Sequence, residues 1–138
     1  MALILDTGPL YSSLDRDERD HAACRRLIEE ADELLIIPGP VLPELDYFVS
    51  RRLGPGVEVV LLRNIEAGAF IVEDPAFEDY ARIRELVDRY ADAGVGFVDA
   101  AILSIVERLG EPKLATMDRR HFTLMRPRHV DALELLPG

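Results

Sequence analysis

Four acidic residues of this chain follow apolar runs that are predicted to be strands of a parallel sheet: Asp6, Glu44, Asp99 and Asp118. Asp6 directly follows the run ALIL, and Asp118 follows the run LAT. Glu44 lies about one turn into the helix predicted after LLII, and Asp99 opens a helix after VGFV. Carboxylates that gather in a fold repel one another, and the usual compensation is a hard divalent cation with oxygen ligands. The pattern predicts Mg²⁺- or Mn²⁺-assisted phosphodiester chemistry.

Each of these acids has a simpler interpretation when it is taken alone. Asp6 and Asp99 could cap the helices that follow them, and Asp118 could cap the short turn RRHF. Glu44 could be a solvated helix residue, although its apolar neighbours place it at the border of the buried face. Four independent coincidences at one sheet edge are harder to accept than one shared site. The group as a whole therefore favours a metal centre.

Several other polar residues give weaker signals. Thr116 ends the predicted strand KLAT, where a β-branched hydroxyl residue either reflects sheet propensity or holds a water beside a metal. Asp92 is a candidate fifth acid, but Asp92-Ala-Gly is typical of a helix end. The histidines His21, His121 and His129 lack metal-site spacing and are expected at the surface, with an RNA contact as the alternative for His121. No GxxxxGK loop or GxSxG elbow occurs, which argues against nucleotide-driven and serine-hydrolase activities.

The elements that must position these residues alternate between strands and helices, which is typical of an α/β fold with a parallel sheet. Strands are predicted at 2–5, 34–37, 69–72 and 113–116, with a candidate edge strand at 133–136. Helices are predicted at 8–14, 18–31, 41–53, 57–68, 75–90 and 99–109, with a turn at 54–56. In such sheets, ligands bind outside the carboxyl ends of the strands, where the strand order reverses. The predicted edge is the one that carries the acids.

Length and charge limit the remaining possibilities. The 138 residues predict one domain spanning 1–138, and the net charge of −10 with a pI near 4.7 argues against a general nucleic-acid binder. The stretch from Lys113 to His129 is nevertheless basic, and Arg119 and Arg120 directly follow Asp118. These two arginines are the candidate RNA-binding residues, with a solvated surface as the alternative.

The cellular compartment is suggested by the single cysteine and by the hydropathy pattern. Cys24 cannot form an internal disulfide and lies on an apolar helical stripe, which indicates a reducing compartment. We identify neither a signal peptide nor an apolar run long enough to cross a bilayer. The expected location is the cytoplasm, without membrane association.

The motifs taken together resemble those of PIN-domain ribonucleases, and specifically the VapC-type toxins of bacterial toxin–antitoxin pairs. The resemblance extends over nearly the whole chain and rests on LILDTGPL, PVLPELDYFVSRRLG, YADAGVGFVDAAILSIVERLG and LATMDRRHFTLMRP, in that order. It implies a three-layer α/β/α sandwich around a parallel sheet, a Mg²⁺ or Mn²⁺ site, and endonuclease cleavage of structured RNA such as a transfer-RNA or ribosomal-RNA loop.

The resemblance also implies roles for individual residues and for partners. The family's acidic quartet corresponds to Asp6, Glu44, Asp99 and Asp118, and its strand-end hydroxyl corresponds to Thr116, with no departure at these positions. A small VapB-like antitoxin whose tail covers the site, and a homodimer of toxin chains, are the implied partners.

Two other hypotheses remain open from the sequence. One is a PIN-like module that binds a partner without catalysis, against which the complete acidic set argues. The other is a receiver-type phosphoaccepting signalling domain, which is also a small α/β protein with an acidic Mg²⁺ site. That class requires two adjacent acids after the first strand and a late lysine at a strand end. Here Asp6 is followed by Thr7, and Lys113 begins its strand.

Overall fold

Five parallel strands form the sheet at the centre of the molecule. A computed structural model of the chain describes residues 1–138 and gives the strand order β3-β2-β1-β4-β5. The strands are β1 (Ala2–Leu5), β2 (Leu34–Pro38), β3 (Ile71–Glu73), β4 (Lys113–Ala115) and β5 (Glu134–Leu136). Each neighbouring pair runs parallel. Because β1 lies in the middle of the sheet with helices on both faces, all its residues are buried, as the run ALIL predicted.

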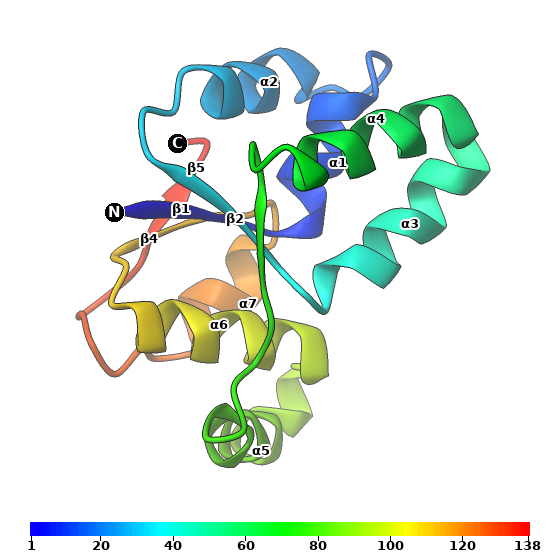
Figure 1. Ribbon diagram of the computed structural model, residues 1–138. Helices are drawn as coiled ribbons and strands as arrows, with labels where there is room; N and C mark the ends of the chain where they lie inside the picture. The colour runs from blue at the N-terminus through cyan, green and yellow to red at the C-terminus, as the bar shows by residue number, and fades with distance from the viewer.

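Helices cover both faces of this sheet (Figure 1). They are α1 (Thr7–Leu14), α2 (His21–Glu29), α3 (Val41–Arg52), α4 (Pro55–Glu66), α5 (Asp79–Arg89), α6 (Phe97–Leu109) and α7 (Arg119–Leu124). In Figure 1, α1, α2 and α4 lie above the sheet, whereas α5, α6 and α7 lie below it. The predicted three-layer α/β/α sandwich is confirmed. No helix has both the length and the apolar composition that a membrane span requires.

Helix α6 is the most important support for the site. Its residues from Ala100 to Val106 are all buried, because the helix packs between the sheet and α5. A helix that is apolar on nearly every side is suited to such an enclosed position. The buried hydroxyl of Ser104 donates to the Ala100 carbonyl oxygen at 2.9 Å, so even its polar group is satisfied. The first turn of α6, which contains Asp99, is therefore held firmly against the sheet.

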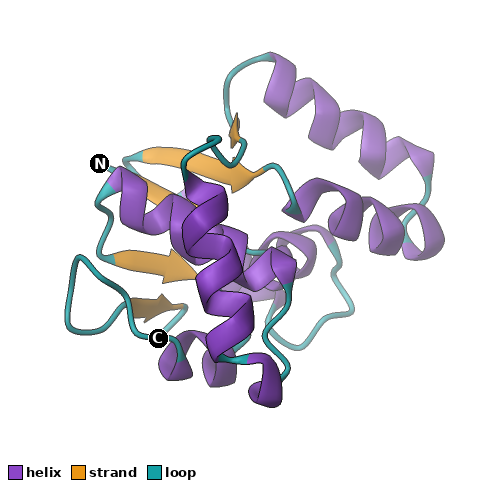
Figure 2. Ribbon diagram, turned by 90° about the horizontal axis from the view of Figure 1, so that it is seen from below, coloured by secondary structure: helices purple, strands orange, loops and turns teal.

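Helices α3 and α4 form a hairpin that projects from one corner of the molecule (Figure 2). Gly54 joins them with φ of 87°, a conformation that glycine adopts without steric cost. Pro55 then opens α4 at its first position, where a missing backbone N–H leaves no hydrogen bond unmade. The turn predicted at 54–56 is thus confined to Gly54, and the other two residues are helical.

Several predicted boundaries were wrong: the helix predicted at 99–109 begins at Phe97, the one predicted at 57–68 spans Pro55–Glu66, and three further differences have a local cause. The strand predicted at 69–72 lies at Ile71–Glu73, since Ala69 and Phe70 instead continue the hydrogen bonding at the end of α4. The helix predicted from Pro75 begins at Asp79, whose carboxylate accepts from the Ala76 N–H at 2.8 Å and closes a turn.

The helix predicted at 18–31 spans only His21–Glu29. Asp15 accounts for the late start, because its carboxylate accepts from the Asp17 N–H at 2.9 Å and from the Tyr11 hydroxyl. These bonds stabilise turns between α1 and α2 in place of a further helical turn.

The strand order also tests the receiver-type hypothesis. Receiver domains have the doubly wound order 2-1-3-4-5, whereas this sheet has the order 3-2-1-4-5. The reversal of strand order lies between β1 and β4, so the crevice for a ligand opens after Leu5 and Ala115. The topology contradicts the receiver-type hypothesis. It predicts that the ligand site is formed by the residues that follow β1 and β4.

Candidate metal centre

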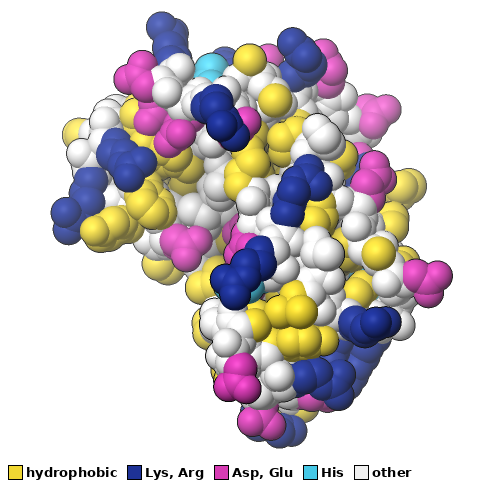
Figure 3. All heavy atoms as spheres, turned by 180° about the vertical axis from the view of Figure 1, so that it is seen from behind, with side chains coloured by type: hydrophobic (Ala, Val, Ile, Leu, Met, Phe, Trp, Pro, Cys, Tyr) yellow, Lys and Arg dark blue, Asp and Glu magenta, His cyan; other side chains and the backbone are white.

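The four predicted acids lie together at this crevice. Asp6, Glu44, Asp99 and Asp118 line a single hollow of about 290 Å³ at the carboxyl ends of β1 and β4. They come from the end of β1, the first turn of α3, the first turn of α6 and the residue before α7. Figure 3 shows the surface hollowed between two lobes, with acidic side chains in the hollow and basic side chains on either side.

Asp6 is the most buried of the four acids, with 7% of its surface exposed. One carboxylate oxygen accepts from the Thr7 N–H at 2.7 Å, and the other accepts from the Thr116 hydroxyl at 2.7 Å. Burial raises the pKa of Asp6 to about 6, even though both hydrogen bonds favour the charged form. Repulsion from Asp99 and Glu44 adds to this rise. Asp6 therefore both caps α1 and presents a desolvated carboxylate to the hollow.

Thr116 binds Asp6 from the buried side of its carboxylate and does not line the hollow. Its side chain is completely buried, and its hydroxyl accepts from the Asp118 N–H at 3.0 Å while donating to Asp6. One hydroxyl thus fixes a carboxylate at the end of β1 relative to the backbone after β4. The sequence left two interpretations of Thr116: sheet propensity, or a hydroxyl that holds a water beside a metal. The structure does place the hydroxyl beside the centre, but it orients Asp6 and does not face the cavity.

Glu44 reaches the hollow from an exposed position on α3. Its carboxylate accepts from the Thr7 hydroxyl, while the Thr7 N–H binds Asp6. Thr7 therefore links the two carboxylates through adjacent groups. This geometry agrees with the expectation that the longer glutamate side chain extends back toward the sheet edge, whereas Asp46, two residues later, is exposed and outside the hollow.

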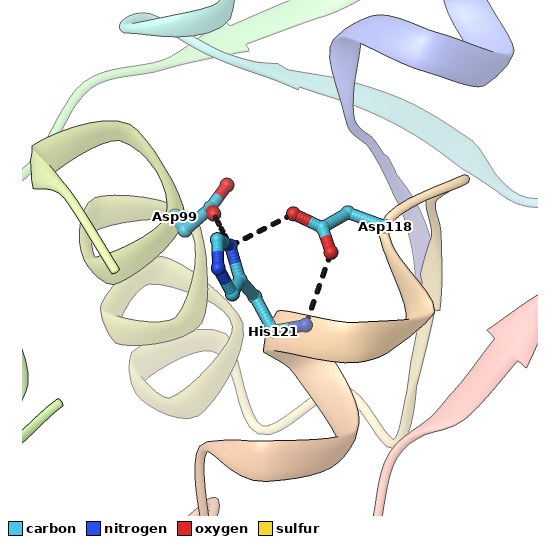
Figure 4. A group of neighbouring side chains, drawn as sticks. All are labelled: Asp99, Asp118 and His121. Carbon is cyan, nitrogen blue, oxygen red and sulfur yellow. Dashed lines mark hydrogen bonds and ion pairs between the residues drawn. The ribbon is translucent and has the colours of Figure 1, made fainter. Parts of the chain in front are cut away.

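Asp99 and Asp118 are joined by His121 of α7 (Figure 4). The Nδ1 atom of His121 lies 2.7 Å from Asp99 Oδ2 and 2.9 Å from Asp118 Oδ2. Its Nε2 atom lies 3.1 Å from the Ala93 carbonyl oxygen. Both ring nitrogens lie beside oxygen atoms that can accept hydrogen bonds, an arrangement that favours the protonated ring. The hydrogen bond to Asp99 accordingly raises the pKa of His121, and burial raises the pKa of Asp99.

His121 was missed as a site residue by sequence reasoning, which placed it at the surface. The available signal was its position three residues after Asp118, which caps α7 by accepting from the His121 N–H at 3.0 Å. A residue at the third helical position points back toward its cap. Asp118 therefore both caps α7 and lines the hollow. Its capping of α7 brings His121 into the centre.

The remaining candidates lie outside the hollow. Asp92 is exposed in the short 3₁₀ segment Ala91–Ala93, which ends at Gly94 as predicted. His21 binds the Ser12 carbonyl oxygen at 2.7 Å, and His129 binds that of Glu111 at 2.6 Å. These two histidines stabilise local structure.

Arg119 and Arg120 begin α7 beside the centre, but they differ in their contacts. The guanidinium of Arg119 donates to the backbone carbonyl oxygens of Leu135 and Pro137, which ties α7 to the C-terminal segment. Arg120 is exposed and forms no ion pair, and it lines a large hollow of about 1160 Å³ together with Arg126.

Comparison with known proteins identifies the family. The family model described as the PIN domain matches residues 3–126. The chain belongs to the PIN-domain family. Ribonuclease VapC26 of Mycobacterium tuberculosis is 33% identical over 125 residues, which are 91% of this chain and 93% of that protein.

Solved structures agree with the PIN fold. VapC20 of Mycobacterium tuberculosis, a sarcin-ricin loop cleaving toxin, is similar with a TM-score of 0.77 at 18% identity, over 86% of this chain and 92% of that one. VapBC2 of Rickettsia felis, bound to a promoter DNA fragment, has a TM-score of 0.70 at 20% identity. DNA-bound VapBC of Salmonella typhimurium has a TM-score of 0.68 at 18% identity. Each of these two covers 98% of both chains compared.

The donor set of this PIN domain fits a hard divalent cation. The hollow offers carboxylate oxygens from four side chains, and one of them, Asp6, is almost completely shielded from solvent. A carboxylate oxygen of Asp99, one of Asp118 and a ring nitrogen of His121 lie within 4.8 Å of one another, and the two carboxylates are the ligands in this group when the ring is protonated.

The metal-free PIN domain is predicted to lose stability as the pH rises from 4 toward 8. The folded state raises the pKa of Asp6 from 3.8 to about 6, so it binds that proton more tightly than the unfolded chain does. Ionisation therefore costs roughly 3 kcal/mol, and the loss is complete above pH 6. The pKa of His121 is also raised, so its stabilisation is present below pH 6.5 and disappears at higher pH.

Urea unfolding in EDTA at pH 5 and pH 8 measures this effect. Asp6→Asn should lose less stability over the same range, because asparagine can still accept from Thr7 and donate to Thr116. Identical pH dependence in the two proteins would contradict the raised pKa of Asp6.

Divalent metal is predicted to stabilise the wild type more than Asp6→Asn. A ligand that binds only the folded state adds about 3 kcal/mol at a hundred times its Kd. Loss of the most desolvated carboxylate should weaken binding and reduce the gain in Tm with Mn²⁺ at pH 8. Asp92→Asn removes the same charge outside the hollow and should retain the full gain. Equal gains in Asp6→Asn and in the wild type would rule out this centre.

Proposed function

We propose that this chain is a metal-dependent endoribonuclease toxin of the VapC type, which cleaves a loop of structured RNA. The observation that carries the proposal is the convergence of Asp6, Glu44, Asp99 and Asp118 on one hollow at the switch point of the sheet. The extensive similarity to a curated VapC ribonuclease supports the same activity.

In this proposal Asp6, Glu44, Asp99 and Asp118 hold Mg²⁺ or Mn²⁺ through their carboxylate oxygens. The chemistry that the cation supplies when bound is neutralisation of charge at the phosphate and activation of a water. Thr116 positions Asp6 through its 2.7 Å hydrogen bond. His121 orients Asp99 and Asp118 and, when protonated, adds positive charge beside the cleaved phosphate.

The RNA would approach over α7, where the basic residues lie. Arg120 is free to contact a phosphate, and Arg119 is restricted by its bonds to the C-terminal segment. RNA loops suit a recessed centre because their unstacked bases can be splayed apart, which a continuous duplex does not allow. Sequencing the 5′ ends of RNA fragments after induction, with Asp6→Asn as the control, identifies the substrate and the cleaved bond.

The proposed partners are a VapB-like antitoxin that covers the site and a second copy of the chain. The similarity to VapBC complexes supports an antitoxin partner for this fold. The buried, unpaired Cys24 is compatible with action in the reducing cytoplasm.

The alternative function is a PIN-like module that binds a partner without cleaving RNA. The desolvated carboxylates argue against it, because they cost stability that a mere binding surface does not require. Metal-dependent cleavage in vitro separates the two functions.

Asp6→Asn and Asp99→Asn are each predicted to reduce RNA cleavage by about a hundredfold or more, since each removes electrostatic stabilisation of the reacting phosphate. Both variants should fold, and Asp6→Asn should be more stable than the wild type in EDTA at pH 8. Cleavage with Mn²⁺ is measured beside the matched control Asp92→Asn, which should retain activity. An Asp6→Asn variant that melts earlier yet cuts normally would leave Asp6 as a helix cap only, whereas Asp99 lies within the first turn of α6 and does not cap it.

The double variant Arg119→Ala/Arg120→Ala is predicted to weaken RNA binding and to flatten its salt dependence. Each phosphate contact that is lost reduces the slope of log K against log salt by about one. Arg120→Ala alone should account for most of the change, because Arg119 is engaged with backbone carbonyls.

RNA affinity over a salt series measures this change, with Arg63→Ala on α4 as a control that removes one exposed arginine elsewhere. Metal-induced stabilisation should survive in all three variants. Unchanged affinity and slope in the double variant would place the RNA path away from α7.

A further inference from the structure

The hollow lined by the four carboxylates continues into a second hollow between α1 and α3. The second hollow has a volume of about 400 Å³ and shares Thr7, Gly8 and Glu44 with the first. We infer that it binds one unpaired base of the RNA beside the phosphate that is cleaved, an inference that rests on the proposed function. Its volume lies at the small end of the range for ligand pockets, roughly 300–1,000 Å³, which suits one base and not a helix.

A guanidinium and two aromatic rings form one wall of this second hollow. The Cζ atom of Arg52 lies 5.1 Å from the ring centre of Phe48 and 5.6 Å from that of Tyr11. Glu18 holds the guanidinium from the side, at 3.7 Å. The Arg52 side chain is still 56% exposed, so a planar group has access to it. Aromatic rings and guanidinium planes are the surfaces on which proteins stack splayed RNA bases.

The charges of this hollow favour a base over a phosphate. Its lining includes two acids, Glu18 and Glu44, against the single base Arg52. A phosphate would be repelled by this excess of negative charge, whereas a neutral base would not. Ser12 also lines the hollow, and its hydroxyl makes no hydrogen bond within the chain, so it is available to the polar edge of a base.

The carboxylate hollow also adjoins hollows lined by basic residues, which a phosphate requires. Met117 is shared with a neighbouring hollow that extends to Arg119, and Arg119 in turn lines the large hollow that contains Arg120 and Arg126. A single RNA strand across this edge of the sheet would therefore place a base between α1 and α3 and its phosphates along α7. Figure 3 shows that basic side chains do lie beside the hollowed surface.

The test uses a set of hairpin RNAs that differ at each loop position, cleaved by the full chain with Mn²⁺. The wild type should prefer particular bases at one position next to the cut. Arg52→Ala should raise KM by about tenfold and lose that preference, with little change in kcat, because base stacking contributes to binding. Arg52→Lys keeps the charge but not the plane, so it should behave like Arg52→Ala if stacking is the cause.

The matched control is Arg51→Ala. Arg51 is the neighbouring residue and lies 4.4 Å from the ring centre of Tyr47, so it makes the same type of contact outside the hollow. This variant should retain the wild-type KM and base preference. A structural effect of losing an arginine from α3 would appear in both variants and would not alter the choice of base.

The outcomes separate this inference from the proposed function. Cleavage by Arg52→Ala with unchanged KM and unchanged base preference would overturn the base pocket and leave the ribonuclease intact. The same result combined with weaker binding of an antitoxin peptide would assign the hollow to an acidic or aromatic side chain of a protein partner, and would also overturn it. A wild type that cuts none of the hairpins with Mn²⁺ would overturn both proposals.

Discussion

The burial of a carboxylate among other carboxylates, at the ends of β1 and β4, is the constraint on which the rest of this structure depends. Asp6 is so desolvated that its pKa rises to about 6, and the hydrogen bonds from Thr7 and Thr116 offset only part of that cost. Such a group keeps its shape only if rigid elements hold each carboxylate in place. The buried strand β1 and the buried helix α6 supply that rigidity, so packing of the apolar core fixes the positions of the carboxylates.

The centre is held by two unlike devices. Thr7 links Asp6 and Glu44 through its N–H and its hydroxyl, which are neutral donors. His121 lies between the other two acids, and its protonated ring compensates part of their charge. Positive charge is therefore provided on one side of the hollow only. The side with Asp6 and Glu44 is left with a surplus of negative charge, and this is where a cation lowers the electrostatic energy most.

The sequence predicted the parts of this architecture that depend on continuous buried runs. The run ALIL became the central strand, and its end correctly placed Asp6 at the crevice. His121 could not be found in the same way, because its role depends on Asp118 capping α7 and on α6 lying alongside. The late start of α2 likewise depends on the side-chain bonds of Asp15, which compete with helix formation and leave no trace in hydrophobic periodicity.

A chain with a net charge of −10 repels RNA overall, so binding of RNA depends on a local group of positive side chains. Arg82 and Arg108 are paired with acids and stabilise the packing around α5 and α6. Arg120 and Arg126 form no ion pairs, and both line the hollow beside α7. Under the proposed function, the acidic centre repels a phosphate until a cation is bound, because the carboxylates and the phosphate carry the same charge. Binding of RNA and its cleavage would then depend on the same ion, and Arg120 and Arg126 would lie along the path that leads to it.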